Sequence, residues 1–302
     1  MHDPVTKNAH IPMSINQPGI LFVVATPIGN LKDITLRALE ILKTVDLIAA
    51  EDTRHTSRLL NHYQIVTPLI SCHEHNEHDK KHQIIHLLQE GKSIALVSDA
   101  GTPTISDPGF RLIACAVENN ITISPIPGVC SPIAALSASG LPTDSFLFKG
   151  FLSKKKKKRE EQLHEMKPLP NTLIIFESPN RILQLLIDMI QIIGDRQAVL
   201  ARELTKIHEE LIHGCLSTIV SLLKPRLKIK GECILIVKGN HNNPELSISD
   251  AMHELKEYLC DTSMKRSDVA KMIAQKYNMP RSIVYKNSLI LFSDDPTLNQ
   301  NE

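Results

Sequence analysis

The segment IALVSDAGTPTISDPGF, residues 94–110, constrains the fold of this chain more than any other. Its apolar start predicts a buried strand, and the glycines and prolines that follow predict a loop. Asp107 followed by Pro108 is typical of a helix start, so we predict a helix over the amphipathic RLIACAVE. This order places Asp99 and Asp107 at the carboxyl end of a strand, where open α/β sheets bind their ligands.

The alternation of strand and helix patterns continues on both sides of this segment. Short β-rich runs predict further strands at residues 20–25, 46–50, 68–72 and 121–124. Helices are predicted between them, one capped by Asp33 and two others over residues 53–60 and 79–90. Strands that alternate with helices through short links predict a mostly parallel sheet that is covered on both faces.

A second set of elements follows a break near residues 139–149. Strands are predicted at 172–176, 197–203, 208–213 and 231–237, and helices at 180–192 and 215–224. Because this half has fewer crossover helices, we predict a mixed sheet. The predicted α/β chain therefore has four parts: a flexible tail over 1–18, α/β domains over 19–143 and 144–240, and a helical extension over 245–292.

The composition excludes several classes of protein. The 302 residues are 42% hydrophobic, which is enough for a packed core in two domains. A net charge of +1 requires any nucleic-acid contact to come from local clusters. No run of about 18 apolar residues is present, so we predict no membrane span. The polar N-terminus has no signal-peptide core and the six cysteines form no CxxC pair, which predicts a cytoplasmic protein with reduced thiols.

Seven loop motifs follow the predicted strands in one order along the chain. They are TPIGN (26–30), AEDTR (50–54), SDAGTPTISDPG (98–109), PGVCSPIAAL (127–136), FESPNR (176–181), RELTKIHEE (202–210) and KGE (230–232). Together they resemble the tetrapyrrole-methylase fold family of class III S-adenosylmethionine-dependent methyltransferases, and most of all the branch that methylates a cytidine ribose 2′-oxygen in 16S ribosomal RNA. The resemblance runs from about Ile20 to Lys238. One position departs from it, because Asn180 stands where the family usually has a histidine.

The resemblance implies both a cofactor and partners. The family holds S-adenosylmethionine in a cleft between its two domains, and the cofactor supplies the reactive methyl group. The implied acceptor is small-subunit ribosomal RNA or the ribosomal subunit, and the implied assembly is a homodimer. The cofactor-binding residues implied here are Ile28, Asp99, Gly101, Thr102, Ile105, Ser131, Pro132, Phe176, Ala201 and Gly231. Neither GxGxxG nor GxxxxGK[ST] is present, which disfavours a dinucleotide-binding enzyme and an NTPase.

A ribose 2′-hydroxyl is a poor nucleophile until it loses its proton, so a nearby carboxylate or histidine accelerates the transfer. The catalytic candidates from the first domain follow predicted strands, and they are Glu51, Asp52, Arg54, His73, Glu74 and His75. Glu177 is a further candidate from the second domain. Arg54 either holds a phosphate or pairs with Asp52. The alternative is that Glu51, Asp52 and Arg54 only cap the next helix and form a surface ion pair.

Basic residues after the domain break are the predicted RNA contacts, since each positive charge can release counterions from RNA. They are Lys154, Lys155, Lys156, Lys157, Lys158, Arg159 and Arg181. The alternative is a solvated helix start, balanced by Glu160, Glu161 and Glu165 through i,i+4 pairs. No metal site is predicted, because His78, His82 and His86 recur on one solvated helix face and no cysteine pair or HExxH accompanies them.

Two rival functions remain open. The same fold could methylate a small tetrapyrrole, although the basic run and the helical extension favour RNA. A non-catalytic RNA-binding protein is the rival from another class, but it leaves Asp99 and the glycine loops unexplained. The three short helices predicted after residue 245 either contact nucleic acid or serve packing and dimerisation.

Overall fold

The computed structural model describes residues 18–240, 248–261, 265–277 and 279–293. They form two compact units, an α/β unit over 18–167 and 171–239 and a helical unit from 240 onward with residues 168–170. The predicted flexible tail lies outside the described residues, except for Pro18. Over the described part of the chain, every helix is too short or too polar to cross a lipid bilayer.

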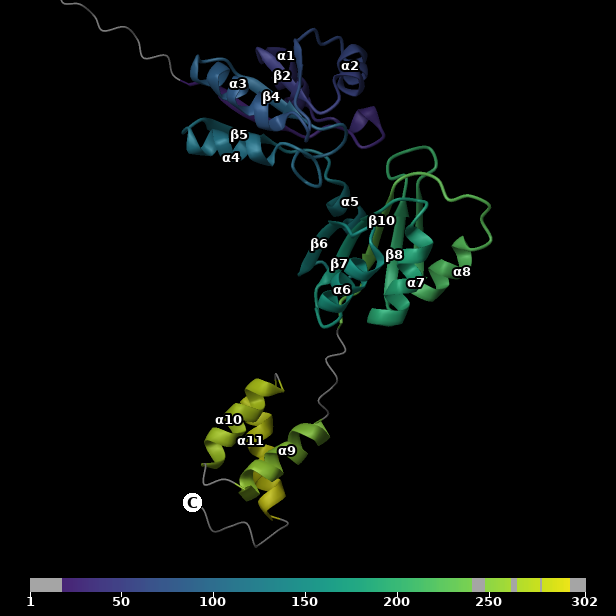
Figure 1. The fold of residues 1–302 in the computed structure, drawn as a ribbon. Helices are drawn as coiled ribbons and strands as arrows, with labels where there is room; N and C mark the ends of the chain where they lie inside the picture. Colours follow the sequence, from purple (N-terminus) through teal and green to yellow (C-terminus); the bar gives the residue numbers. More distant parts are fainter. Residues whose placement is uncertain (1–17, 241–247, 262–264, 278, 294–302) are drawn as a thin grey trace, which may run out of the picture. The chain divides into compact units, whose positions relative to one another are not determined.

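The first sheet of the α/β unit is entirely parallel (Figure 1). Its strands, in the order β3-β2-β4-β1-β5, are β1 (Ile20–Val24), β2 (Leu47–Ala50), β3 (Leu69–Ser71), β4 (Ile94–Val97) and β5 (Thr122–Ile126). The helices between them are α1 (Leu36–Thr44), α2 (Thr53–His62), α3 (Glu77–Gln89) and α4 (Phe110–Glu118), with a 3₁₀ turn, η1 (Leu31–Asp33).

Two hydrophobic clusters cover the two faces of this sheet. Ile84 of α3 and Leu112 of α4 pack on one side with Leu21 of β1. Leu42 of α1 and Leu60 of α2 pack in the other cluster. The predicted parallel sheet with helices on both faces is therefore confirmed.

The second sheet is mixed, as predicted. Its strands, in the order β6-β7-β10-β8-β9, are β6 (Phe146–Phe151), β7 (Thr172–Glu177), β8 (Gln197–Arg202), β9 (Glu210–Cys215) and β10 (Cys233–Val237). Only the β6–β7 pair is parallel. Three helices accompany it, α6 (Lys156–Met166), α7 (Ile182–Ile193) and α8 (Leu216–Leu223). A short helix, α5 (Ser131–Ser137), packs Ala135 and Leu136 against the apolar residues of this sheet.

Strand β6 is missing from the sequence prediction, and its geometry explains why. The register shifts between Phe148 and Gly150, and Gly150 has a φ of 61°. Such a bulge interrupts the period-two alternation by which a strand is recognised in a sequence.

Two predicted helix starts are wrong. Asp33 closes the 3₁₀ turn, and Thr35 caps α1 by accepting a hydrogen bond from the Ala38 N–H at 3.1 Å. Helix α4 begins at Phe110 after Gly109, whose φ of 116° places the chain close to Leu96 of β4. Because that turn replaces the expected cap, Asp107 and its carboxylate remain in the loop.

The helical unit consists of α9 (Ile248–Asp261), α10 (Arg266–Lys276) and α11 (Arg281–Ser293). Leu255, Val269, Ile273 and Val284 form its buried core. Glu254 of α9 pairs with Lys276 of α10, which ties the first two helices together. The prediction of three short helices is confirmed, and their mutual packing gives the unit a core of its own.

Candidate active site

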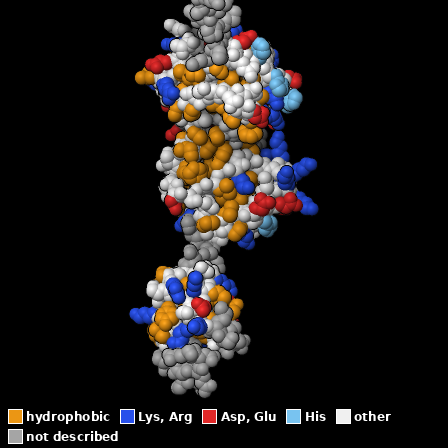
Figure 2. Space-filling view, turned by 90° about the vertical axis from the view of Figure 1, so that its left-hand side faces the viewer, with side chains coloured by type: hydrophobic (Ala, Val, Ile, Leu, Met, Phe, Trp, Pro, Cys, Tyr) orange, Lys and Arg blue, Asp and Glu red, His pale blue; other side chains and the backbone are white. Residues whose placement is uncertain are grey.

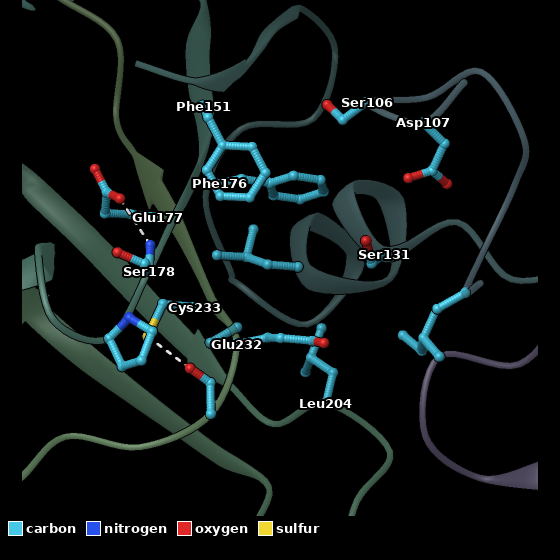
Figure 3. Close-up of a pocket in the computed structure, with 16 residues that line it drawn as sticks. Ser106, Asp107, Ser131, Phe151, Phe176, Glu177, Ser178, Leu204, Glu232 and Cys233 are labelled. Carbon is cyan, nitrogen blue, oxygen red and sulfur yellow. Dashed lines mark hydrogen bonds between the residues drawn. The ribbon is translucent and has the colours of Figure 1, made fainter. Parts of the chain in front are cut away.

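A cavity of about 340 Å³ lies within the α/β unit, where loops of the first sheet meet strand ends of the second (Figure 3). We call it the donor cavity. Its volume falls in the range of small-molecule sites. Its lining residues are Ile28, Ala100, Ser106, Asp107, Ser131, Phe151, Phe176, Glu177, Ser178, Pro179, Ala201, Leu204, Gly231, Glu232, Cys233 and Ile234.

Backbone contacts between the loops shape the first-sheet side of the cavity. The Thr26 N–H donates to the Gly101 carbonyl at 2.8 Å, and the Gly101 N–H donates to the Thr26 carbonyl at 3.0 Å. Gly101 has a φ of 83°, a conformation that glycine adopts without strain. The Thr102 hydroxyl donates to the Val129 carbonyl at 2.9 Å. These bonds join three loops that follow different strands of one parallel sheet.

The second-sheet side is largely apolar. The rings of Phe151 and Phe176 pack edge to face with centroids 5.5 Å apart, and Phe148 packs on Phe176 at 5.0 Å. Figure 3 shows the two cavity-lining rings together, with Ser131 and Asp107 beyond them. A side chain at Gly231 would overlap that of Glu203, so only glycine fits at this edge of the cavity.

Three carboxylic acids, Asp107, Glu177 and Glu232, line the cavity, and the described lining includes no lysine, arginine or histidine. Glu177 pairs with Arg181 at 3.1 Å, and Glu232 pairs with Lys206 at 3.3 Å. Burial, together with the nearby charges of Glu51 and Asp99, raises the pKa of Asp107 to about 6. The cavity therefore favours a cationic ligand.

Acidic residues also gather where β2 and β4 end. The Asp52 N–H donates to Asp99 Oδ1 at 3.0 Å, and the Asp99 N–H donates to Glu51 Oε2 at 3.3 Å. Burial raises the pKa of Glu51, and the charges of Asp99 and Asp52 act in the same direction. Glu51, Asp99 and Asp107 thus form one electrostatically coupled group beside the cavity.

The structure separates the predicted cofactor residues into two sets. Five of them line the donor cavity, and these are Ile28, Ser131, Phe176, Ala201 and Gly231. Asp99 lines an adjoining hollow. Gly101, Thr102 and Ile105 belong to the surrounding loop and Pro132 to the first turn of α5, and none of the four is part of the lining.

Several lining residues escaped the sequence analysis. Asp107 was placed at the ligand-binding edge of the sheet, but it was not named as a cofactor-binding or catalytic residue, because Pro108 after it indicated a helix cap. Phe151 belongs to the strand that was not predicted. Glu232 follows Gly231 in the KGE motif. Only its position in the folded chain shows that it lines the cavity.

None of the six catalytic candidates from the first domain lines the donor cavity, over the residues that the structure describes. Asp52 caps α2 and pairs with Arg54 at 2.9 Å, which is the arrangement of the alternative interpretation. The His73 N–H donates to Asn76 Oδ1 at 2.8 Å, and Glu74 is exposed. Glu51 comes nearest, through its coupling to Asp107.

The predicted RNA contacts differ in exposure. Lys154 to Lys158 are exposed at the start of α6. Arg159 is only 7% exposed, and its guanidinium contacts Asp188 Oδ2 at 2.6 and 2.8 Å. The prediction that Arg159 contacts RNA is therefore wrong, because its charge is buried in an ion pair. Arg181 is partly buried and donates to the Leu152 and Ser153 carbonyls in addition to pairing with Glu177.

A model of the family described as Tetrapyrrole (Corrin/Porphyrin) Methylases matches residues 21–220. The chain belongs to this family. The methylase is 46% identical to ribosomal RNA small subunit methyltransferase I of Synechocystis sp., over 91% of this chain and 99% of the relative. It is 45% identical to the protein of the same name from Escherichia coli O157:H7, over 91% and 96% of the two chains.

A solved structure shows the same fold. It is the uroporphyrin-III C-methyltransferase of Thermus thermophilus complexed with S-adenyl homocysteine, at a TM-score of 0.52 and 16% identity, over 73% of the methylase and 97% of that chain. The methylase uses S-adenosylmethionine as its methyl donor. The donor cavity suits this compound, because a sulfonium and an ammonium group fit a lining that carries three carboxylic acids and, among its described residues, no basic side chain.

Proposed function

We propose that this methylase transfers a methyl group from S-adenosylmethionine to the ribose 2′-oxygen of a cytidine in 16S ribosomal RNA of the small subunit. The extent of the similarity carries the proposal. Relatives named for small-subunit ribosomal RNA match 91% of this chain, or about 275 of its 302 residues, so the match extends past residue 240 into the helical unit.

The tetrapyrrole rival lacks this feature. The uroporphyrin-III enzyme is covered almost completely, at 97%, by only 73% of this chain. About a quarter of the methylase therefore has no counterpart in an enzyme whose name specifies a small tetrapyrrole. A macromolecular acceptor gives the additional residues a use, and a tetrapyrrole does not.

When bound, S-adenosylmethionine supplies an electrophilic methyl carbon. The ribose oxygen attacks this carbon in line with the breaking carbon–sulfur bond, and S-adenosylhomocysteine leaves as a neutral thioether. The 2′-hydroxyl proton passes to a carboxylate of the group Glu51, Asp99 and Asp107, of which Asp107 lines the donor cavity. A pKa of about 6 leaves Asp107 mostly ionised at pH 7 yet basic enough to accept the proton.

Transfer of labelled methyl groups tests the proposal. We expect label from S-adenosylmethionine to enter 16S ribosomal RNA, either free or in small subunits, and to be lost when the target ribose lacks its 2′-hydroxyl. Label that enters a tetrapyrrole and not the RNA would establish the rival methylase. Binding of RNA without any transfer would favour the non-catalytic protein.

A homodimer and a cytoplasmic location are parts of the same proposal. Figure 2 shows hydrophobic side chains gathered on the face of the α/β unit that it presents. Exposed aromatic side chains of this unit include Phe110, at 72%, and Phe151, at 59%. Large exposed apolar areas favour association with another protein surface. Light scattering should therefore give twice the mass of one chain.

The cytoplasmic location follows from the proposed acceptor, because an enzyme that methylates ribosomal RNA acts where that RNA is found.

A further inference from the structure

Two more hollows in the α/β unit carry the positive charge that the donor cavity lacks. The inner hollow, of about 300 Å³, is lined by His55 and Arg58 of α2 and by Lys206 of the β8–β9 loop, and its lining also includes the carboxylates of Asp99 and Glu232. It adjoins the donor cavity through three shared lining residues, Ile28, Ala100 and Glu232. A ligand that extends from the inner hollow therefore reaches the donor cavity.

The outer hollow, of about 610 Å³, continues away from the inner one. The two share Gly29, Leu31 and Lys206. The lining of the outer hollow adds Lys32, His62 and His208, and among the described residues it includes no carboxylate. Positive potential therefore increases from the donor cavity outward, which is the direction expected for a polyanion.

Contact between the two halves of the α/β unit creates these hollows. The Asn30 N–H donates to Thr205 Oγ1 at 3.0 Å. Gly29 lies so close to Thr205 and Lys206 that a side chain on it would overlap both. The loop 26–30 and the β8–β9 loop thus bring residues from distant parts of the sequence together.

A buried oxygen without a partner belongs to a residue on the wall of the inner hollow. Thr56 lines the inner hollow, and only 3% of the residue is exposed. Its Oγ1 is buried and has no hydrogen-bond partner among the described residues. Buried hydroxyls are nearly always hydrogen-bonded, so an orphan on the wall of a hollow marks the position of a polar ligand atom.

Two of the cations are also uncompensated. Arg58 and Lys32 have no carboxylate within ion-pair distance, over the residues that the structure describes. Lys206, by contrast, pairs with Glu203 at 2.9 Å and with Glu232 at 3.3 Å. The charges of Arg58 and Lys32 are therefore available to a ligand.

We propose that the inner and outer hollows bind the sugar–phosphate backbone of the RNA next to the methylated nucleotide. Arg58 and the Thr56 hydroxyl hold the backbone beside the reacting ribose, and Lys32 holds a phosphate further along. The identity of the RNA rests on the proposed function. Neither lining contains Phe, Tyr or Trp among its described residues, and its basic side chains favour contact with the phosphates of the backbone.

The salt dependence of RNA binding tests the two cations. Arg58→Ala and Lys32→Ala should each weaken binding of a 16S ribosomal RNA transcript about five-fold near 0.15 M salt. Each should also reduce the slope of log affinity against log salt concentration by about 0.7 to 0.9. The matched controls are Arg37→Ala and Lys43→Ala, which remove exposed charges of α1 outside both hollows.

The hydroxyl has its own test. Thr56→Val should weaken RNA binding several-fold without changing the salt slope, and Thr56→Ser should restore binding. Affinity for S-adenosylmethionine should stay at its wild-type value and the melting temperature should not fall, since Thr56 is outside the donor cavity and its buried oxygen has no internal bond to lose. A melting temperature lowered in Thr56→Val and restored in Thr56→Ser would instead give the hydroxyl a structural role.

The outcomes separate this proposal from the proposed function. If wild-type protein binds and methylates the RNA but the Arg58 and Lys32 variants keep the wild-type slope, the hollows are not the RNA site. If alanine replacement of Lys154 to Lys158 then lowers the slope of log affinity against log salt concentration, the RNA binds at these lysines. If wild-type protein methylates no ribosomal RNA, the proposed function fails, whatever these variants do.

Discussion

The donor cavity adjoins the inner hollow, which continues into the outer one, and the three differ in charge and surface. The donor cavity has aromatic walls and carboxylic acids as its charged groups. The inner hollow adds arginine, lysine and histidine to Asp99 and Glu232, and the described lining of the outer hollow has basic side chains without a carboxylate. A cationic methyl donor and an anionic RNA need such opposite electrostatic environments in neighbouring sites. The net charge of +1 does not reveal this separation, because charges of opposite sign cancel in the sum over the chain.

The separation arises from which loops form each site. Asp107 comes from the loop after β4 and Glu177 from the end of β7. Arg58 comes from α2, and Lys206 from the loop between β8 and β9. Glu232 lies on both linings and pairs with Lys206, so it marks the boundary.

Gly231→Ala should disrupt the donor cavity most. The new methyl group would overlap Glu203, and the φ of 86° is unfavourable for alanine. We expect a loss of about 2 kcal/mol in stability and at least a thirty-fold loss of S-adenosylmethionine affinity, measured by denaturation and calorimetry. Gly194→Ala is the control, since its φ is 90° but the space around it is open. Equal effects of the two substitutions would show that the effect of Gly231→Ala comes from backbone strain alone and not from the overlap with Glu203.

Phe176→Ala removes the apolar wall of the donor cavity. We expect about a ten-fold weaker affinity for S-adenosylmethionine, since a buried aromatic contact is worth roughly 1.5 kcal/mol or more. RNA affinity should not change, because Phe176 lines neither basic hollow. Phe146→Ala, a partly exposed position of β6 outside the cavity, should leave both affinities unchanged. A parallel loss of RNA affinity in Phe176→Ala would show that the two sites are not independent.

Asp107→Asn should change how stability depends on pH. The pKa of Asp107 is about 6 in the folded protein, above its ordinary value of 3.8, so the folded state binds the proton more tightly than the unfolded state. Its stabilising contribution is therefore complete below pH 3.8 and is lost as the pH rises to about 6. After discounting for solvent screening, we expect this loss to be about 1 kcal/mol.

The asparagine variant lacks this loss, so its stability relative to that of wild type should rise across that pH range. Asp144→Asn, at an exposed position, should show no such difference. Denaturant titrations at pH 4, 5, 6 and 7 measure it. If the stabilities of wild type and Asp107→Asn depend on pH in the same way, Asp107 is not coupled to Glu51 and Asp99.

Glu232→Gln should have the smallest effects, in opposite directions at the two sites. The loss of a carboxylate from the donor cavity should weaken S-adenosylmethionine binding two- to three-fold. The release of Lys206 from one of its two ion pairs should strengthen RNA binding by a similar factor. Effects of the same sign on both ligands would contradict the proposed boundary.

Regular patterns made much of the fold predictable. The alternation of strands and helices predicted the parallel first sheet, and the scarcity of crossover helices predicted the mixed second one. Local irregularities limited the rest. The bulge at Gly150 hid β6, and Asp107 before Pro108 imitated a helix cap that the turn at Gly109 replaces.

Charged residues were harder to interpret than glycines. Arg159 is one of six consecutive basic residues, yet it reaches inward to Asp188 while its five lysine neighbours stay in solvent. Helical periodicity turns adjacent residues to different faces, and only packing against α7 shows which face is buried. Arg58 and Lys32, by contrast, belong to no recognisable basic cluster and are brought together only by folding.

The alternation of strands and helices and the family of the chain could be read from the amino-acid sequence, because they depend on local spacing and on motifs of a few residues. The folded arrangement was needed to show which charges share a cavity, which are neutralised, and that the Thr56 hydroxyl has no partner among the described residues. Coulomb interactions and burial depend on distances in space, which local spacing does not give. Residues as far apart in sequence as Lys32 and Lys206 become neighbours only when the two halves of the α/β unit pack together.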